Sequence, residues 1–193
     1  MIKALVPLAN GVEEMEAVIV IDVLRRARWD VVSAGLTRGN ITASRGVKLV
    51  ADADWREINP MEFDVLVLPG GREGARALST DPGVQDTIRS FVQAGKWVAA
   101  ICAGPLALQT AGVLRGRRAT CHPAVRDELT EARRVDDRVA VDGRLVTSQG
   151  PGTAFEFALA LVRLVDGPAA ADAIAPGLVL PPPTVPGATT SPH

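Results

Sequence analysis

Hydrophobic positions along residues 1–175 fall into two kinds of run that alternate. Short runs rich in β-branched residues are separated by longer stretches in which apolar residues recur every three or four positions. This alternation is typical of a parallel sheet whose strands are joined by crossover helices, and continuously apolar strands indicate a sheet covered on both faces. The predicted strands are residues 2–8, 30–34, 65–68, 97–101, 119–121 and 145–148, and the predicted helices are residues 14–27, 82–93, 104–111, 123–129 and 153–165.

Two stretches break the alternation. Residues 41–51 are interrupted by Arg45-Gly46, and residues 135–141 contain Asp136-Asp137, which is typical of a hairpin turn. We expect both stretches to form small antiparallel additions to the main sheet.

The composition is that of one globular α/β domain. Of the 193 residues, 47% are hydrophobic and 22% are charged, which excludes wholesale disorder and a collagen-like or disulfide-rich scaffold. The formal net charge of −1 provides no field that would attract nucleic acid or an anionic membrane. A small molecule or a protein is therefore the favoured partner.

The amino terminus runs directly into polar Asn10-Gly11 and lacks the long apolar stretch of a signal peptide. The longest later apolar runs, residues 17–21 and 158–162, fall short of the ~20 residues that span a bilayer, so we expect a soluble cytoplasmic protein. The only two cysteines, Cys102 and Cys121, fit a reducing compartment. Residues 181–193 are rich in proline and predict a disordered tail after a single domain at residues 1–180.

The most informative segment is the apolar run at residues 97–101, which stops at Cys102 before small residues open a helix at Gly104-Pro105. A cysteine at the start of a helix lies near the positive end of the helix dipole and near unpaired N–H groups, which favour thiolate over thiol. The pattern indicates a sharp turn from strand to helix that presents a nucleophile. A buried core cysteine is the alternative that the pattern leaves open.

Glu16 is the candidate partner of that cysteine. Glu13 and Glu14 fit an exposed helix start, whereas Glu16 adjoins the apolar run and shares a helical face with Ile19 and Val20. A half-buried carboxyl at this position would have a raised pKa and could hydrogen-bond a thiolate or shuttle a proton. A solvated glutamate in the first turn is the alternative.

His122 is the imidazole available to an internal site, because the other histidine, His193, ends the tail. It lies at the carboxyl end of a predicted strand, where open α/β sheets bind their ligands, and a capping role is the alternative. Cys121 should point to the opposite face and is interpreted as a small core residue, with a redox-resolving role as the alternative. The cysteines and histidines lack the spacing of a metal site.

Two glycine clusters follow predicted strands, Gly70-Gly71 and Gly150-Pro151-Gly152. Neither has the spacing of a nucleotide-binding motif. The N–H group of Gly71 is a candidate donor to an oxyanion, and plain turn formation is the alternative.

Five segments recur in a known order: Gly11-Val12-Glu13-Glu14-Met15-Glu16, Leu68-Pro69-Gly70-Gly71, Ala99-Ala100-Ile101-Cys102-Ala103-Gly104-Pro105, Thr120-Cys121-His122-Pro123, and Gly150-Pro151-Gly152-Thr153-Ala154-Phe155-Glu156-Phe157-Ala158. Together they resemble the ThiJ/PfpI superfamily over about residues 2–180, most closely the branch of the parkinsonism-associated protein deglycase. The protease-like branch has a histidine where this chain has Ala103. Glutamine amidotransferases carry a glutamate two residues after the catalytic histidine, where this chain has Ala124. Membership of the protease-like branch and of the glutamine amidotransferases is therefore disfavoured.

The resemblance implies a flavodoxin-like parallel sheet sandwiched between helices and a homodimer. It also implies that the N–H groups of Gly71 and Ala103 form an anion pocket. Arg45 resembles an arginine that reaches the site of a neighbouring subunit, with Arg26 nearby.

For the reaction, the resemblance makes Cys102 the nucleophile and oxidation-sensitive thiol, Glu16 its proton shuttle and His122 a nearby imidazole. The implied function is a glutathione-independent glyoxalase or protein deglycase that acts without a cofactor on 2-oxoaldehydes such as methylglyoxal and glyoxal, or on their early protein adducts. The second hypothesis is a redox-responsive protective protein or chaperone in which Cys102 oxidises to a sulfinate.

Overall fold

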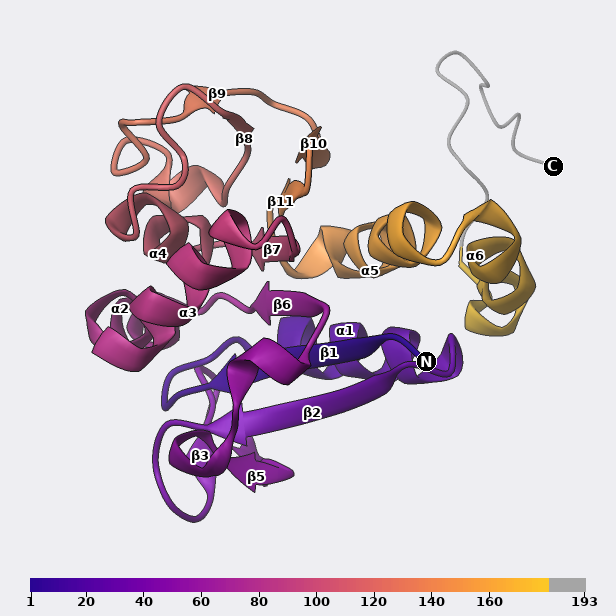
Figure 1. Ribbon diagram of the computed structural model, residues 1–193, viewed down its shortest axis with the longest axis horizontal. Coiled ribbons are helices and arrows are strands. Elements are labelled where there is room, and N and C mark those ends of the chain that lie inside the picture. Colours follow the sequence, from indigo (N-terminus) through magenta and orange to yellow (C-terminus); the bar gives the residue numbers. More distant parts are fainter. Residues whose placement is uncertain (181–193) are drawn as a thin grey trace, which may run out of the picture.

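A seven-stranded sheet forms the centre of the computed structural model, which describes residues 1–180 (Figure 1). The strand order is β10-β11-β7-β6-β1-β2-β5, and every neighbouring pair is parallel except β10 with β11. The strands are β1 (Lys3–Leu8), β2 (Asp30–Gly35), β5 (Ala53–Asp54), β6 (Val65–Leu68), β7 (Trp97–Ile101), β10 (Val139–Asp142) and β11 (Leu145–Ser148). The expected flavodoxin-like sheet between helices is confirmed.

Helices cover both faces of this sheet. On one face, α1 (Glu14–Arg26) packs against α5 (Ala154–Val165), which α6 (Pro168–Ile174) flanks. On the other face lie α2 (Arg72–Thr80), α3 (Pro82–Gln93) and α4 (Pro105–Thr110), which are grouped together in Figure 1. Each face has its own buried hydrophobic cluster, and the central strand β6 is buried at every position because it contributes to both.

Local sequence signals explain where the helices begin and end. The first turn of α1 carries Glu14 and Glu16 and its last turn carries Arg25 and Arg26, so the charges oppose the helix dipole at both ends. Asp81 caps α3 by accepting a hydrogen bond from the N–H of Val84 at 2.9 Å.

The antiparallel additions differ in detail from the prediction. Residues 41–51 do form a small hairpin, β3 (Ile41–Thr42) with β4 (Lys48–Leu49). The second hairpin turns at Gly143, between β10 and β11, and the prediction of a turn at Asp136-Asp137 is wrong. Asp136 and Asp137 instead lie in the segment that leads into β10, where their carboxylates pair with Arg126 and Arg118.

Three further elements differ from the sequence pattern. The predicted strand at residues 119–121 is outside the main sheet, since β8 (Arg118–Ala119) pairs only with β9 (Arg133–Arg134). The predicted helix at residues 123–129 is a 3-10 turn over Pro123–Val125, because backbone hydrogen bonds there join residues three apart. Helices α2 and α6 were not predicted, and the predicted tail at residues 181–193 lies outside the described residues.

Candidate active site

Four strands of the sheet end at one crevice. Cys102 follows β7, Gly70 and Gly71 follow β6, the segment before α1 follows β1, and Gly150 follows β11. The carboxyl edge of an open parallel sheet is the usual place for a ligand, because the loops that leave adjacent strands there diverge.

Cys102 occupies a strained backbone turn. Its φ of 64° lies in the left-handed region, which costs a non-glycine residue about 1–2 kcal/mol. Its N–H donates to the carbonyl of Ser148 at 2.9 Å, and its own carbonyl accepts the N–H of His122 at 2.9 Å. Hydrogen bonds on both sides thus hold the sulfur at the crevice, as the predicted strand-to-helix turn requires.

Glu16 is completely buried, at 0% exposure, rather than half-buried as predicted. Its Oε2 accepts the N–H of Gly70 at 2.8 Å, while Oε1 has no hydrogen-bond partner of full geometry within residues 1–180. Burial raises the pKa of Glu16 to about 7, while interactions with the thiol of Cys102 and the N–H of Gly70 lower it. A carboxyl with this pKa can either hold or release a proton near neutral pH.

The thiol of Cys102 is coupled to this carboxyl. Burial raises the pKa of Cys102 to about 12 and the negative charge of Glu16 contributes to the rise, whereas the N–H groups of Gly71 and Ala103 act in the opposite direction. The expectation that the turn favours a resting thiolate is therefore wrong while Glu16 is ionised. Protonation of Glu16 removes this repulsion and leaves a carboxyl that can donate to a thiolate, so one proton is shared by the pair.

Gly71 has a geometry that only glycine fits. Its φ is +80°, and a Cβ there would lie 2.1 Å from the carbonyl oxygen of Gly11. The N–H of Gly71 can therefore approach the sulfur of Cys102 together with the N–H of Ala103. Two backbone donors directed at one atom are the arrangement that the sequence analysis expected of an anion pocket.

His122 contributes to the same crevice and Cys121 does not. Nδ1 of His122 accepts the N–H of Ala124 at 3.1 Å, so its side chain caps the 3-10 turn. Cys121 is only 7% exposed and belongs to the hydrophobic cluster beneath α4, where burial raises its pKa. The interpretation of Cys121 as a core residue is confirmed.

The crevice is a pocket of about 460 Å³ with Cys102 in its lining. Its walls combine six parts of the chain: Gly11 and Glu13; Ala43, Ser44 and Arg45; Gly71, Arg72 and Glu73; Cys102 and Ala103; His122, Ala124 and Val125; and Pro151. Ser44, Arg72 and Glu73 were not among the predicted site residues. Arg72 and Glu73 begin the unpredicted helix α2, whose buried apolar side chains are Ala75 and Leu78.

The structure separates the two predicted arginines. Arg45 lines the pocket, and its N–H donates to Oε1 of Glu14 at 2.9 Å. Arg26 lies in the last turn of α1, outside the pocket lining, and pairs with Asp22 at 2.6 Å. Arg26 is therefore not near Arg45 within one chain, since the length of α1 lies between them.

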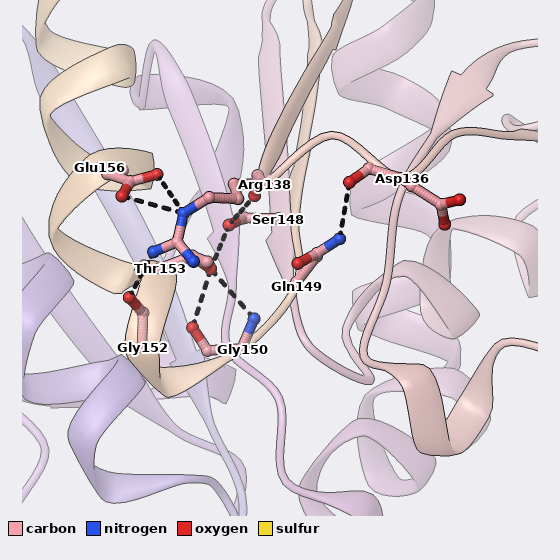
Figure 2. Close-up of polar contacts among 8 residues, drawn as sticks. All are labelled: Asp136, Arg138, Ser148, Gln149, Gly150, Gly152, Thr153 and Glu156. Carbon is pink, nitrogen blue, oxygen red and sulfur yellow. Dashed lines mark hydrogen bonds and ion pairs between the residues drawn. The ribbon is translucent and has the colours of Figure 1, made fainter. Parts of the chain in front are cut away.

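A polar network holds the loop that carries Pro151 (Figure 2). Arg138 donates to Glu156 of α5 at 2.8 Å and to the carbonyl of Gly152 at 2.8 Å. Thr153 Oγ1 lies 2.6 Å from Ser148 Oγ and accepts the N–H of Gly150 at 3.1 Å. Side chains from the segment before β10, the end of β11 and the start of α5 thus fix one wall of the pocket.

Within residues 1–180, no group of three histidine, cysteine, aspartate or glutamate side chains is arranged to hold a metal ion. No helix among the described residues is long and apolar enough to cross a membrane.

The fold and the strained cysteine define a class: flavodoxin-like α/β domains that carry a cysteine on a strained turn at the carboxyl edge of the sheet. The chain belongs to the DJ-1/PfpI family, whose model matches residues 2–164. It is 46% identical to protein DJ-1 homolog B of Arabidopsis thaliana over 83% of its own length, although it spans only 37% of that longer protein. It is 37% identical to the glutathione-independent glyoxalase DJR-1.2 of Caenorhabditis elegans, covering 81% of this chain and 84% of that one.

Among solved structures, the crystal structure of Drosophila melanogaster DJ-1beta is similar with a TM-score of 0.90 and 41% identity, over 94% of this chain and 99% of that chain. The family expected from the five sequence segments is confirmed.

Proposed function

We propose that this chain is a cofactor-independent glyoxalase that converts 2-oxoaldehydes such as methylglyoxal into 2-hydroxy acids. The observation that carries the proposal is the buried carboxyl of Glu16, whose pKa of about 7 suits a proton shuttle beside the thiol of Cys102. The similarity to a relative named as a glutathione-independent glyoxalase supports the same reaction. Free 2-oxoaldehydes and their early adducts on proteins are the substrates that we propose.

In the first step, ionised Glu16 takes the proton of the Cys102 thiol as the sulfur attacks the aldehyde carbon. A C–S bond forms, the carbonyl π bond opens, and the aldehyde oxygen takes that proton from Glu16 to give a hemithioacetal and restore the ionised carboxylate. The N–H groups of Gly71 and Ala103 stabilise the negative charge that sulfur and oxygen carry during the addition.

In the second step, Glu16 removes the proton from the former aldehyde carbon and delivers it to the neighbouring carbon, while the hydroxyl proton moves from the oxygen of the first carbon to the oxygen of the second. The former aldehyde carbon is oxidised by two electrons and its neighbour is reduced by two, so the product is a 2-hydroxy thioester and no external oxidant is needed. Water then cleaves the C–S bond, releasing lactate in the case of methylglyoxal and restoring the thiol. His122 lines the same pocket and assists the transfer of the proton between the two carbons.

The test is the direct measurement of lactate from methylglyoxal with purified protein. We expect lactate from the wild-type chain and from Cys121→Ser, because Cys121 is buried in the core, and none above background from Cys102→Ser. Loss of methylglyoxal alone is not sufficient, since any thiol captures it. Equal lactate from wild type and Cys102→Ser would refute the proposal.

A second candidate function is protection through oxidation of Cys102, as a redox sensor or chaperone. The observation that favours it is the convergence of two N–H groups and the carboxyl of Glu16 on one sulfur. Two equivalents of peroxide would convert the thiolate to a sulfinate and release two waters, and the N–H groups would stabilise the product. Mass spectrometry after mild peroxide treatment should find oxidation at Cys102 before Cys121, and equal rates would argue against this role.

We also propose that the chain forms a homodimer in the cytoplasm, where its two thiols remain free. Val18 on α1 is 50% exposed and Val50 next to β4 is 78% exposed, and both line one groove of about 310 Å³. Met15 and Val47 extend the exposed apolar surface close to Arg45. A second copy that covers this surface would bury these side chains and bring Arg45 to the interface.

A further inference from the structure

The imidazole of His122 has its two nitrogens in different situations. Nδ1 accepts the N–H of Ala124 at 3.1 Å, and a backbone N–H can only donate, so Nδ1 carries no proton. No hydrogen bond engages Nε2 within residues 1–180. A neutral imidazole has one N–H, and in this structure it must be at Nε2.

The ring is also held in its orientation. The N–H of His122 donates to the carbonyl of Cys102, which ties the residue to the reactive turn. On the other side of the ring, a Cβ added at Gly150 would lie 3.1 Å from Cδ2 and 3.9 Å from Nε2. The turn at Gly150 is in turn fixed by Thr153 and by the bond from Arg138 to Gly152 (Figure 2). The hydrogen bond from Ala124 to Nδ1 selects this orientation of the ring, because a flipped ring would place a carbon there.

We infer that His122 serves the pocket as a neutral hydrogen-bond donor through Nε2–H and is not a base. Nδ1 accepts the hydrogen bond that caps the 3-10 turn, and Nε2 carries the proton. If Nδ1 carried the proton instead, the N–H of Ala124 would face another N–H. The inference rests on the proposed function for its substrate: the donor would bind an oxygen of the 2-oxoaldehyde, which becomes negatively charged when Glu16 removes the carbon-bound proton.

The tautomer can be tested without any assay of activity. The ¹⁵N and ¹H signals of the imidazoles in the full-length protein at neutral pH distinguish a nitrogen that carries a proton from one that does not. There are two histidines, so a His193→Ala variant assigns the remaining signals to His122. We expect a protonated Nε2 and an unprotonated Nδ1. A protonated Nδ1, alone or together with Nε2, would overturn the inference.

Two substitutions separate the cap from the donor. In His122→Asn, the amide oxygen can take the place of Nδ1 and keep the cap, but nothing reaches the position of Nε2. In His122→Gln, the amide NH₂ can reach the position of Nε2, but the cap is lost. We expect His122→Asn to remain as stable as the wild type and to lose on the order of 100-fold in kcat/KM for lactate formation. We expect His122→Gln to be less stable and to stay within about tenfold of the wild-type kcat/KM.

These opposite changes in stability and activity would not arise from a purely structural role. If His122→Gln is the weaker enzyme of the two, His122 acts through its cap and the inference is wrong. If the wild-type chain forms no lactate, the proposed function fails, and the imidazole signals alone then decide the assignment of His122.

Discussion

The N–H of Gly70 donates to Oε2 of Glu16 at 2.8 Å and so orients one oxygen of a carboxyl that is entirely buried. The other oxygen, Oε1, has no partner of full hydrogen-bond geometry in residues 1–180. Gly70 also lies against Cys102, so one glycine sets how closely acid and thiol approach each other. The reactive pair therefore depends on the absence of a side chain at position 70.

Gly70→Ala should disrupt the pair. A Cβ at this position would lie 2.5 Å from Cβ of Cys102, 2.7 Å from Oε2 of Glu16 and 2.9 Å from the nitrogen of Ala103. We expect a loss of about 1–3 kcal/mol in the free energy of unfolding, measured with urea, and a large loss of lactate formation.

Gly152→Ala is the matched control, since a Cβ there meets nothing within 4 Å and the backbone is not in the left-handed region. Unchanged stability and activity in Gly70→Ala would show that the close approach is not required.

Glu16→Gln should abolish the proton shuttle while keeping the size of the side chain. We expect kcat/KM for lactate formation to fall by about 10²–10⁴-fold, the usual contribution of a positioned acid or base. Glu57→Gln removes an exposed carboxylate outside the pocket lining and should leave kcat/KM unchanged. Activity of Glu16→Gln within a few-fold of the wild type would mean that another group carries the proton.

The pH dependence of activity should report the same carboxyl. The pKa of Glu16 is raised by burial to about 7, and the reaction needs its ionised form to accept the thiol proton. Below this pKa the base is protonated, so kcat/KM should rise about tenfold between pH 6 and pH 8. A profile that is flat across this interval would contradict the assignment of Glu16 as the base.

Stability should change in the opposite direction over a similar interval. Because the pKa of Glu16 rises from 4.5 in the unfolded chain to about 7 in the fold, its stabilising contribution is complete below pH 4.5 and is lost as pH increases through 7. The loss amounts to about 3 kcal/mol in the free energy of unfolding. Urea titrations at pH 5 and pH 8 should show this decrease in the wild type. Glu16→Gln, which cannot ionise, should show a smaller decrease, and equal decreases would refute the account.

The proposed dimer should depend on the exposed apolar surface of α1 and β4. Val50→Glu places a charge on a side chain that is 78% exposed and lines the groove beside Val18. We expect a dimer for the wild type and a monomer for this variant by analytical ultracentrifugation. Leu164→Glu introduces the same charge on α5, at a residue that is 40% exposed and outside this groove, and should remain dimeric. A wild-type monomer would refute the dimer.

Sequence patterns predicted the elements whose formation depends on residues that are close together in the chain. The apolar runs that became β1, β6 and β7 are recognisable because a strand buried on both faces needs continuous hydrophobicity. The predicted helix at residues 123–129 failed because Val125 and Leu129 have helical spacing but the backbone between them closes 3-10 bonds. Helix α2 was missed because its nine residues are mostly polar and its stability depends on packing against α4.

The sequence alone determined the alternation of strands and helices, the strand-end position of Cys102 and the residue types available to the site, because these follow from periodicity and chain order. Tertiary structure decided the chemistry. Glu16 and Cys102 are 86 residues apart in the sequence, and only the parallel pairing of β1, β6 and β7 brings their loops together. Burial at that meeting point raises the pKa of both Glu16 and Cys102, against the tendency of the helix start to favour a thiolate. The loss of solvent around Glu16 and Cys102 depends on neighbours from several loops. No local pattern of residues in the sequence shows these neighbours.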